Sequence, residues 1–167
     1  MVVREATAAD AWAIEAVHCA AFPTSAEARL VTGLEEDGDV LASFVAEIEG
    51  ATVAHIAFSR MTVFADGNAL AAAGLGPLAV MPPYQGLGFG GLLVRTGLEA
   101  MAAKGMQICF VLGDPDYYSR FGFRGDLAVP FASPYAGPHL MACLLDSAVC
   151  VPERGEAHYA PAFARLE

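Results

Sequence analysis

The sequence predicts an α+β fold in which helices flank a mixed, mostly antiparallel β-sheet. Two observations carry this prediction. Between residues 41 and 80, alternating apolar segments are separated by short turn signals, a pattern typical of an antiparallel meander. A glycine-rich loop at residues 86–91 then leads into a helical pattern and an apolar run. The chain therefore contains one central strand–glycine loop–helix–strand unit and lacks repeated βαβ units.

Length and hydrophobicity predict a single domain over residues 1–167. A chain of 167 residues, 56% of them hydrophobic, can bury a substantial core, which excludes a disordered protein. No apolar run approaches the ~18 residues that cross a bilayer, and the N-terminus lacks the apolar core of a signal peptide. We therefore expect a cytoplasmic protein without a membrane partner.

The net charge and the spacing of the cysteines limit the ligands that this protein is expected to bind. The formal net charge of −10 repels phosphate backbones, so we expect no nucleic-acid partner, and an anionic ligand must be held by local donors. Cys19, Cys109, Cys143 and Cys150 form no CxxC pair, which indicates buried free thiols and no metal site.

The N-terminal residues predict a short strand followed by two helices. Residues 2–5 are suited to a strand. Thr7 and Asp10 have the spacing of a capping box, which marks the start of a helix. The apolar residues that follow at helical spacing are Ile14, Val17 and Ala21. Pro23 ends this helix, and a second helix is expected over residues 25–36.

Three strands with short connections follow. We expect them over residues 41–48, 52–63 and 70–80. Glu49-Gly50 forms the first turn. Asp66-Gly67 is a strong hairpin signal, because both central positions of a type I′ turn require positive φ. Short turns between consecutive strands predict antiparallel pairing.

A helix and a buried strand follow the glycine loop. The helix is expected over residues 89–104 and ends before Gly105. Its apolar face consists of Phe89, Leu92, Leu93, Gly97, Ala100 and Met101. The run at residues 107–112 is apolar throughout, which favours a buried strand in parallel pairing.

The last predicted elements are a short helix and a late strand. Asp114 and Pro115 resemble an N-cap followed by proline at the first helical position. The helix extends through Phe121 and stops at Gly122. Residues 140–145 form a further strand, and residues from 155 onward carry no clear pattern.

The glycine loop is best explained as a binding site for an anion. Glycine inside a helix costs roughly 1 kcal/mol relative to alanine, so four glycines within residues 86–91 lower stability. In return, the backbone can approach a ligand closely, and free N–H groups at the helix N-terminus can bind a phosphate. Peptide donors of this kind suit an acidic chain that has few basic side chains.

The loop also matches the G-x-G-x-x-G fingerprint of dinucleotide-binding proteins, and Asp114 lies at about the distance of a ribose-binding acid. Two features oppose this reading. Residues 82–85 separate the strand from the glycines, and an antiparallel meander precedes the unit. A Walker A loop is excluded because no Gly-Lys-Ser/Thr is present.

Two motifs resemble those of GNAT-type N-acetyltransferases. Gln85-Gly-Leu-Gly88-Phe-Gly90 has the Q/R-x-x-G-x-G/A form of their acetyl-CoA loop. Tyr118-Ser-Arg-Phe-Gly-Phe123 resembles their late Tyr-x-x-x-Gly-Phe element, and residues 78–80 resemble the strand before the loop. The resemblance covers residues 2–146. It departs from the pattern at Leu87, where many members carry a basic residue.

The resemblance implies a GNAT-like fold and transfer of an acetyl group from acetyl-CoA to a primary amine of a small molecule or peptide, without a metal. It implies that the strand before the loop diverges from its neighbour at a bulge. The pantetheine arm then pairs with Leu78, Ala79 and Val80. The pyrophosphate sits on the backbone of Gln85, Gly86, Leu87, Gly88, Phe89, Gly90 and Gly91. A homodimer is left open.

Direct transfer in a ternary complex needs a proton for the leaving thiolate. Tyr118 is the candidate general acid, because a phenol with a pKa near ~10 is protonated at neutral pH; the alternative is that its ring only packs with Phe121 and Phe123. A backbone N–H near Val80 would stabilise the developing oxyanion. The general base stays open between His55, Glu47 and water.

Two other functions remain as alternatives. One is a GNAT-fold module that binds or senses acyl-CoA without turnover. The other is an NAD- or FAD-binding protein built on the dinucleotide fingerprint.

Overall fold

The computed structural model describes residues 1–166; Glu167, the last residue of the predicted domain, lies outside the described residues. Within residues 1–166 the strands form an eight-stranded sheet with the order β1-β2-β3-β4-β5-β7, and β8 pairs with β3 and β6. Only β4–β5 and β6–β8 are parallel. The predicted α+β class with a mostly antiparallel sheet is therefore confirmed. The strands are β1 Val2–Glu5, β2 Val40–Ile48, β3 Ala51–Ala65, β4 Asn68–Val80, β5 Ile108–Leu112, β6 Phe131–Ala132, β7 Leu140–Leu144 and β8 Gly155–His158.

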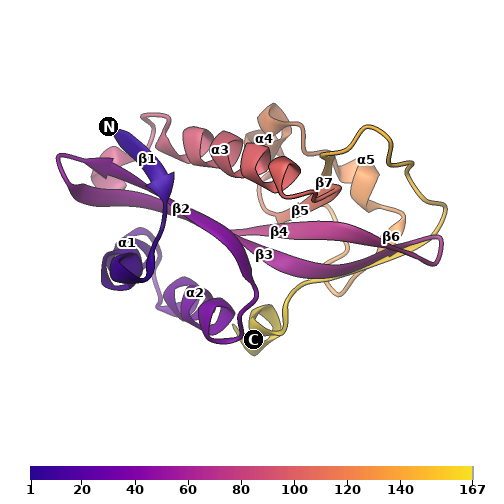
Figure 1. Cartoon of the computed structure of the whole chain (residues 1–167), viewed down its shortest axis with the longest axis horizontal. Coiled ribbons are helices and arrows are strands. Elements are labelled where there is room, and N and C mark those ends of the chain that lie inside the picture. The colour runs from indigo at the N-terminus through magenta and orange to yellow at the C-terminus, as the bar shows by residue number, and fades with distance from the viewer. Residues whose placement is uncertain (167) are drawn as a thin grey trace.

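Helices cover both faces of the sheet. In Figure 1, α1, α2 and the C-terminal 3-10 helix η4 lie on one face, and α3 and α4 lie on the other. The α-helices are α1 Ala11–Ala21, α2 Ala26–Glu36, α3 Phe89–Ala103, α4 Pro115–Tyr118 and α5 Gly125–Ala128. The 3-10 helices are η1 Ala8–Asp10, η2 Pro82–Tyr84, η3 Ser119–Phe121 and η4 Pro161–Leu166.

Local signals placed most elements correctly. Asp10 accepts a hydrogen bond from the backbone N–H of Thr7 at 2.8 Å, so the predicted capping box is present, although it opens the 3-10 turn η1 before α1. Asp114 accepts from the N–H of Asp116 and caps α4. Gly122, with φ of 92°, ends the short helix as expected.

The N-terminus is fixed by one arginine. The Arg4 guanidinium binds both oxygens of Asp10 at 2.7 and 2.8 Å and also contacts the carboxylate of Glu47. These hydrogen bonds hold the pKa of Asp10 well below its usual range. Glu47 is therefore held by a structural ion pair between β1, η1 and β2, where sequence analysis had left it open as a general base.

On one face of the sheet, the helix α3 packs very close to the strands. Phe58, Leu93 and Met101 are fully buried there. Gly97 lies directly over Phe58, and a β-carbon at this position would overlap the aromatic ring. Glycine is thus needed here for the close approach of α3 to β3.

The strands β4 and β5 pair over only a short distance and then diverge. Their parallel pairing ends at Leu75 and Val111. Gly76 and Pro77 follow, and here two residues of β4 face a single residue of β3, which is a β-bulge. Gly76 has φ of 147°, and Pro77 has no N–H to offer to β5. The expected divergence at a bulge is present, and it leaves one edge of the last part of β4 unpaired.

The prediction of buried thiols was wrong for half of the cysteines. Cys109 is buried and Cys143 half-buried, but Cys19 and Cys150 are exposed, and all four are free. Cys19 lies on the outer face of α1. Its position on the helix, and not the hydrophobicity of the thiol, decides that it faces solvent. None of the helices within residues 1–166 has the length and apolar character needed to cross a bilayer.

Candidate active site

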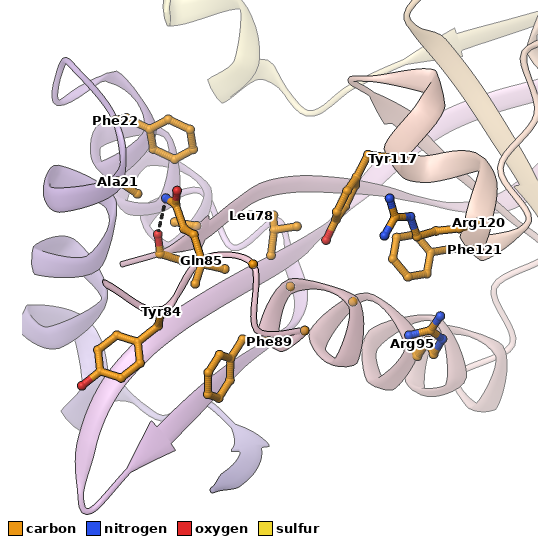
Figure 2. A pocket seen from close by; sticks show the side chains of 16 residues that line it. Ala21, Phe22, Leu78, Tyr84, Gln85, Phe89, Arg95, Tyr117, Arg120 and Phe121 are labelled. Atoms are coloured by element: carbon orange, nitrogen blue, oxygen red, sulfur yellow. Dashed lines mark hydrogen bonds between the residues drawn. The ribbon is translucent and has the colours of Figure 1, made fainter. Parts of the chain in front are cut away.

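A cleft of about 530 Å³ lies where β4 leaves β5. Its floor is the end of β4, and its walls come from the C-terminal end of α1, the glycine loop with the start of α3, and the segment α4–η3. In Figure 2, Phe22, the residue that follows α1, and Tyr117 of α4 stand on opposite sides of Leu78. The volume falls within the range of small-molecule sites.

The unpaired edge of β4 directs backbone groups into this cleft. The N–H of Met81 binds the carbonyl of Val53 on β3, so Met81 faces its paired neighbour. Because backbone groups alternate in direction along a strand, those of Leu78 and Val80 face the opposite edge. The carbonyl of Val80 indeed accepts a hydrogen bond from the Gln85 side chain on that side. Two N–H groups therefore face the cleft without a strand partner.

The glycine loop supplies a second set of backbone donors. Gly86 and Gly88 have φ of 77° and 91°, which L-residues with a β-carbon rarely adopt. Gly88 is the N-cap of α3, and the N–H groups of the first helical turn have no carbonyl partner within the helix. A β-carbon on Gly90 would lie 2.6 Å from the Tyr117 hydroxyl and 3.7 Å from side chains of Leu78 and Val80. A side chain there would fill the cleft.

The three residues at positions 85–91 that are not glycine differ in where their side chains lie. The side-chain amide of Gln85 donates a hydrogen bond to the Val80 carbonyl at 2.9 Å and so ties the loop to the end of β4. The backbone N–H of Gln85 donates to the carbonyl of Pro82. Leu87 points to solvent with 67% of its surface exposed, and Phe89 is buried against Tyr84. The Leu87 side chain thus lies in solvent outside the cleft, whereas Phe89 is among the residues that line it.

Two arginines that sequence analysis did not single out line the cleft. Arg95 lies one turn beyond Gly91 on α3, with its guanidinium over the ring of Phe121 at 4.9 Å. Arg120 of η3 lies over the ring of Tyr117 at 4.9 Å. Stacking on aromatic faces holds both cations beside the loop. In a chain of net charge −10, they supply the positive charge that Leu87 does not.

The two neighbouring tyrosines face different surroundings. Tyr117 lines the cleft, whereas Tyr118 is not among its lining residues in the described part of the chain. The Tyr118 ring lies against Gly113 at the end of β5, where a β-carbon would come within 2.5 Å, and its edge meets Phe123. Tyr118 thus packs against the residue that follows β5 and against Phe123, so its predicted catalytic role stays a prediction.

The environment of the Tyr118 phenol keeps it protonated. Burial, together with the nearby Tyr117 and Cys109, raises the pKa of Tyr118 to about 12. Tyr159, on the opposite face of the sheet, is a further electrostatic neighbour. A phenol with this pKa is neutral throughout the physiological range and can only donate a proton.

His55, one of the candidates for the general base, is buried in a pair with His18. Its Nδ1 lies 2.8 Å from Nε2 of His18 on α1, and both side chains are fully buried. The pair lies behind the cleft wall, because His18 stacks on Phe22 and His55 is the strand partner of Ala79. Burial lowers the pKa of His18 to about 4 and, together with the charge of His18, that of His55 to about 3.

This histidine pair is expected to make stability depend on pH below neutrality. In the unfolded chain each imidazole has a pKa near 6.5, so between pH 6.5 and 4 the unfolded state binds more protons. Stability is therefore full above pH 6.5, falls as the pH decreases from 6.5 toward the folded pKa values, and levels off below them. We expect the free energy of unfolding to fall by about 3 kcal/mol between pH 7 and 5, measured by urea denaturation.

The matched variant keeps the hydrogen-bonding atoms and removes the titration. In His18→Gln/His55→Asn, the amides stand where Nε2 and Nδ1 now lie, and the loss of stability between pH 7 and 5 should largely disappear. His158→Gln, at an exposed position, should retain it. Parallel pH curves for the parent and the double variant would show that other groups cause the acid sensitivity.

The sequence matches the model of a family described as an acetyltransferase (GNAT) domain over residues 2–125. It is 40% identical over 148 residues to the uncharacterized N-acetyltransferase YjhQ of Escherichia coli K12, covering 86% of this chain and 82% of YjhQ.

Two solved structures resemble the whole chain. The GNAT family N-acetyltransferase YhbS from Escherichia coli, in complex with CoA, has a TM-score of 0.85 and 31% identity, covering 99% of this chain and 93% of YhbS. A GNAT family acetyltransferase from Brucella melitensis, in complex with acetyl-CoA, has a TM-score of 0.79 and 31% identity, covering 97% of each chain.

Proposed function

The chain belongs to the GNAT acetyltransferase family, and on that basis we propose that it transfers an acetyl group from acetyl-CoA to a primary amine of a small molecule or peptide. Transfer is direct, within a ternary complex of enzyme, acetyl-CoA and amine. Direct attack needs no covalent nucleophile, so none of the four cysteines has to be catalytic. Proximity of the two bound reactants supplies much of the acceleration.

One observation carries the proposal: the donors of the glycine loop continue into the unpaired edge of β4. The pyrophosphate is bound by the N–H groups of residues 86–91 at the positive end of α3, with Arg95 and Arg120 beside it. The pantetheine arm extends along Leu78, Ala79 and Val80 and pairs with the edge that β5 has left. A polyanion with an amide-bearing arm fits this row of donors.

The remaining groups are assigned to the chemical step. The N–H of Val80, which faces the cleft, stabilises the oxyanion that forms when the amine attacks the thioester carbonyl. Tyr118 donates its proton to the departing thiolate, and its raised pKa keeps that proton in place until transfer. Because His55 is buried in its pair and Glu47 is bound by Arg4, water is the proposed acceptor of the amine's proton.

Binding of acetyl-CoA tests the proposal before any acceptor is known. At 100 times its dissociation constant, a ligand stabilises the folded state by about 2.7 kcal/mol, which raises the Tm of a chain this long by several degrees. We expect this shift with acetyl-CoA and CoA but not with NAD or FAD. Thiol release with a panel of amines then measures turnover.

The alternatives give different outcomes in the same measurements. A Tm shift with NAD or FAD but not with CoA would favour the dinucleotide-binding reading. A shift with acetyl-CoA and no thiol release with any amine would favour a module that binds acyl-CoA without turnover.

A further inference from the structure

The two arginines of the cleft lack the acidic partner that four other arginines of this chain have. Within residues 1–166, neither Arg95 nor Arg120 forms an ion pair with a carboxylate. No aspartate or glutamate is among the described residues that line the cleft. The chain has 19 acidic and 9 basic residues, so a cleft with two cations and no carboxylate is where an anion is expected to bind. The paired arginines are Arg4 with Asp10, Arg60 with Asp39, Arg124 with Asp126 and Arg165 with Asp37.

Both guanidinium groups are held on one pair of neighbouring aromatic rings. Arg95 lies 4.9 Å from the centre of the Phe121 ring, and Arg120 lies 4.9 Å from the centre of the Tyr117 ring. The two ring centres are 5.4 Å apart. Figure 2 shows Arg95, Arg120 and Phe121 together at the end of the cleft away from Phe22. Stacking restricts both side chains, so less conformational entropy is lost when they bind a ligand.

The charges of the two arginines act on the same part of the cleft. Burial raises the pKa of the Tyr117 phenol, and the charges of Arg120 and Arg95 both act against this rise. The Tyr117 hydroxyl itself lies beside the first turn of α3, 2.6 Å from the position of a β-carbon on Gly90. Two like charges that both reach one hydroxyl repel each other, and an anion bound between them would relieve this repulsion.

The arginines lie along the side of α3 and not at its end. Nη1 of Arg95 is 3.2 Å from the position of a β-carbon on Gly91, and the Phe121 ring is 3.5 Å from the same position. A β-carbon points outward from the side of a helix, whereas the free N–H groups of the first turn point along the helix axis. A phosphate on the axis therefore meets the backbone donors, and a second phosphate beside the helix meets the guanidinium groups.

Coenzyme A carries a phosphate group that suits this second position. Besides the pyrophosphate, it has a phosphate monoester on the 3′ oxygen of its ribose, and the ribose joins the two. A phosphate monoester has a charge of about −1.5 to −2 at pH 7 and three terminal oxygens. Two guanidinium groups can bind these oxygens through several charge-assisted hydrogen bonds.

We propose that Arg95 and Arg120 form a binding site for the ribose 3′-phosphate of CoA, and that the protein thereby selects CoA over 3′-dephospho-CoA. The rings of Phe121 and Tyr117 hold the two guanidinium groups in place. The pyrophosphate then lies between this site and the pantetheine arm, which extends along the end of β4. This inference rests on the proposed use of acetyl-CoA.

Two ligands that differ by this one phosphate test the site. We compare CoA with 3′-dephospho-CoA by isothermal titration. The parent protein should bind CoA more tightly by about 10–100-fold, as expected for hydrogen bonds between charged groups. In Arg95→Gln/Arg120→Gln this ratio should fall to near one, mainly through a loss of affinity for CoA. Each single variant should lower the ratio in part.

Two controls separate phosphate binding from a general effect of charge. Lys104→Gln, at the exposed C-terminal end of α3, changes the net charge by the same amount as each single variant and should preserve the ratio. Arg95→Lys keeps the charge but loses the planar group, so it should retain only part of the ratio. The KM values for acetyl-CoA and 3′-dephospho-acetyl-CoA in thiol release give a second readout.

The possible failures are distinguishable. Equal affinity of the parent protein for CoA and 3′-dephospho-CoA would refute the 3′-phosphate site and leave acetyl transfer intact. An equal loss for both ligands in the double variant would assign the arginines to the pyrophosphate and would also refute the site. The expected ratio without thiol release to any amine would refute transfer and retain the site. Binding of neither ligand would refute both proposals.

Discussion

Replacing Tyr118 with phenylalanine is expected to lower turnover by roughly 10²–10⁴-fold, the usual contribution of general acid catalysis. The substitution removes one hydroxyl and keeps the ring that packs against Gly113 and Phe123. Affinity for acetyl-CoA should change little, because the donors for the pyrophosphate and pantetheine lie on α3 and β4. The measurement is single-turnover thiol release with an amine that the parent protein acetylates, beside a binding titration.

Tyr117→Phe is the control for this prediction, because it removes the hydroxyl of the neighbouring tyrosine. The Tyr117 hydroxyl lies at Gly90, in the part of the cleft assigned to the phosphates and the start of the arm. Its loss should weaken acetyl-CoA binding more than it slows the chemical step. If Tyr117→Phe instead reproduces the loss of turnover and Tyr118→Phe behaves like the parent, the acid is Tyr117 and Tyr118 is a packing residue.

Gly90→Val is expected to weaken CoA binding by roughly 10²-fold or more. The new side chain would project toward Leu78 and Val80 and displace the Tyr117 hydroxyl, and it would cover the N–H groups of the first helical turn. Losing even two charge-assisted hydrogen bonds, at about 1.5–3 kcal/mol each, produces an effect of this size. Isothermal titration with CoA provides the measurement.

The fold should tolerate this change, because the displaced atom is the free end of a side chain. Ala103→Val, at the exposed end of the same helix, controls for the cost of a β-branched residue in α3. Comparable CoA affinity in a folded Gly90→Val protein would mean that the pyrophosphate does not lie on this turn.

Elements with a local signal could be predicted, and those without one could not. The capping box of Thr7 and Asp10 and the turn at Asp66-Gly67 are determined within a few residues, so their positions followed from the sequence. The strand β8 pairs with β3 across almost a hundred residues, and β6 has only two residues. Neither is long enough to show a periodicity of its own, which is why the segment from residue 155 carried no clear pattern.

The same distinction applies to the candidate site. The glycine loop was recognisable because backbone conformation dictates the residue type, as the φ of Gly88 shows. The His18–His55 pair joins residues 37 positions apart and has no local signature. Arg95 could have been suspected, since it lies four residues after Gly91 on a predicted helix and so on the same face. Arg120 reaches the cleft only because η3 folds back beside α3.

The close packing of α3 on β3 has a consequence for the thermodynamics of ligand binding. Gly97 lets the helix backbone rest on Phe58, and Gln85 ties the loop to the end of β4. The donors are thus immobilised when the chain folds, before any ligand arrives. Association then orders few additional backbone torsions, so little conformational entropy is lost and more of the contact energy is retained as affinity.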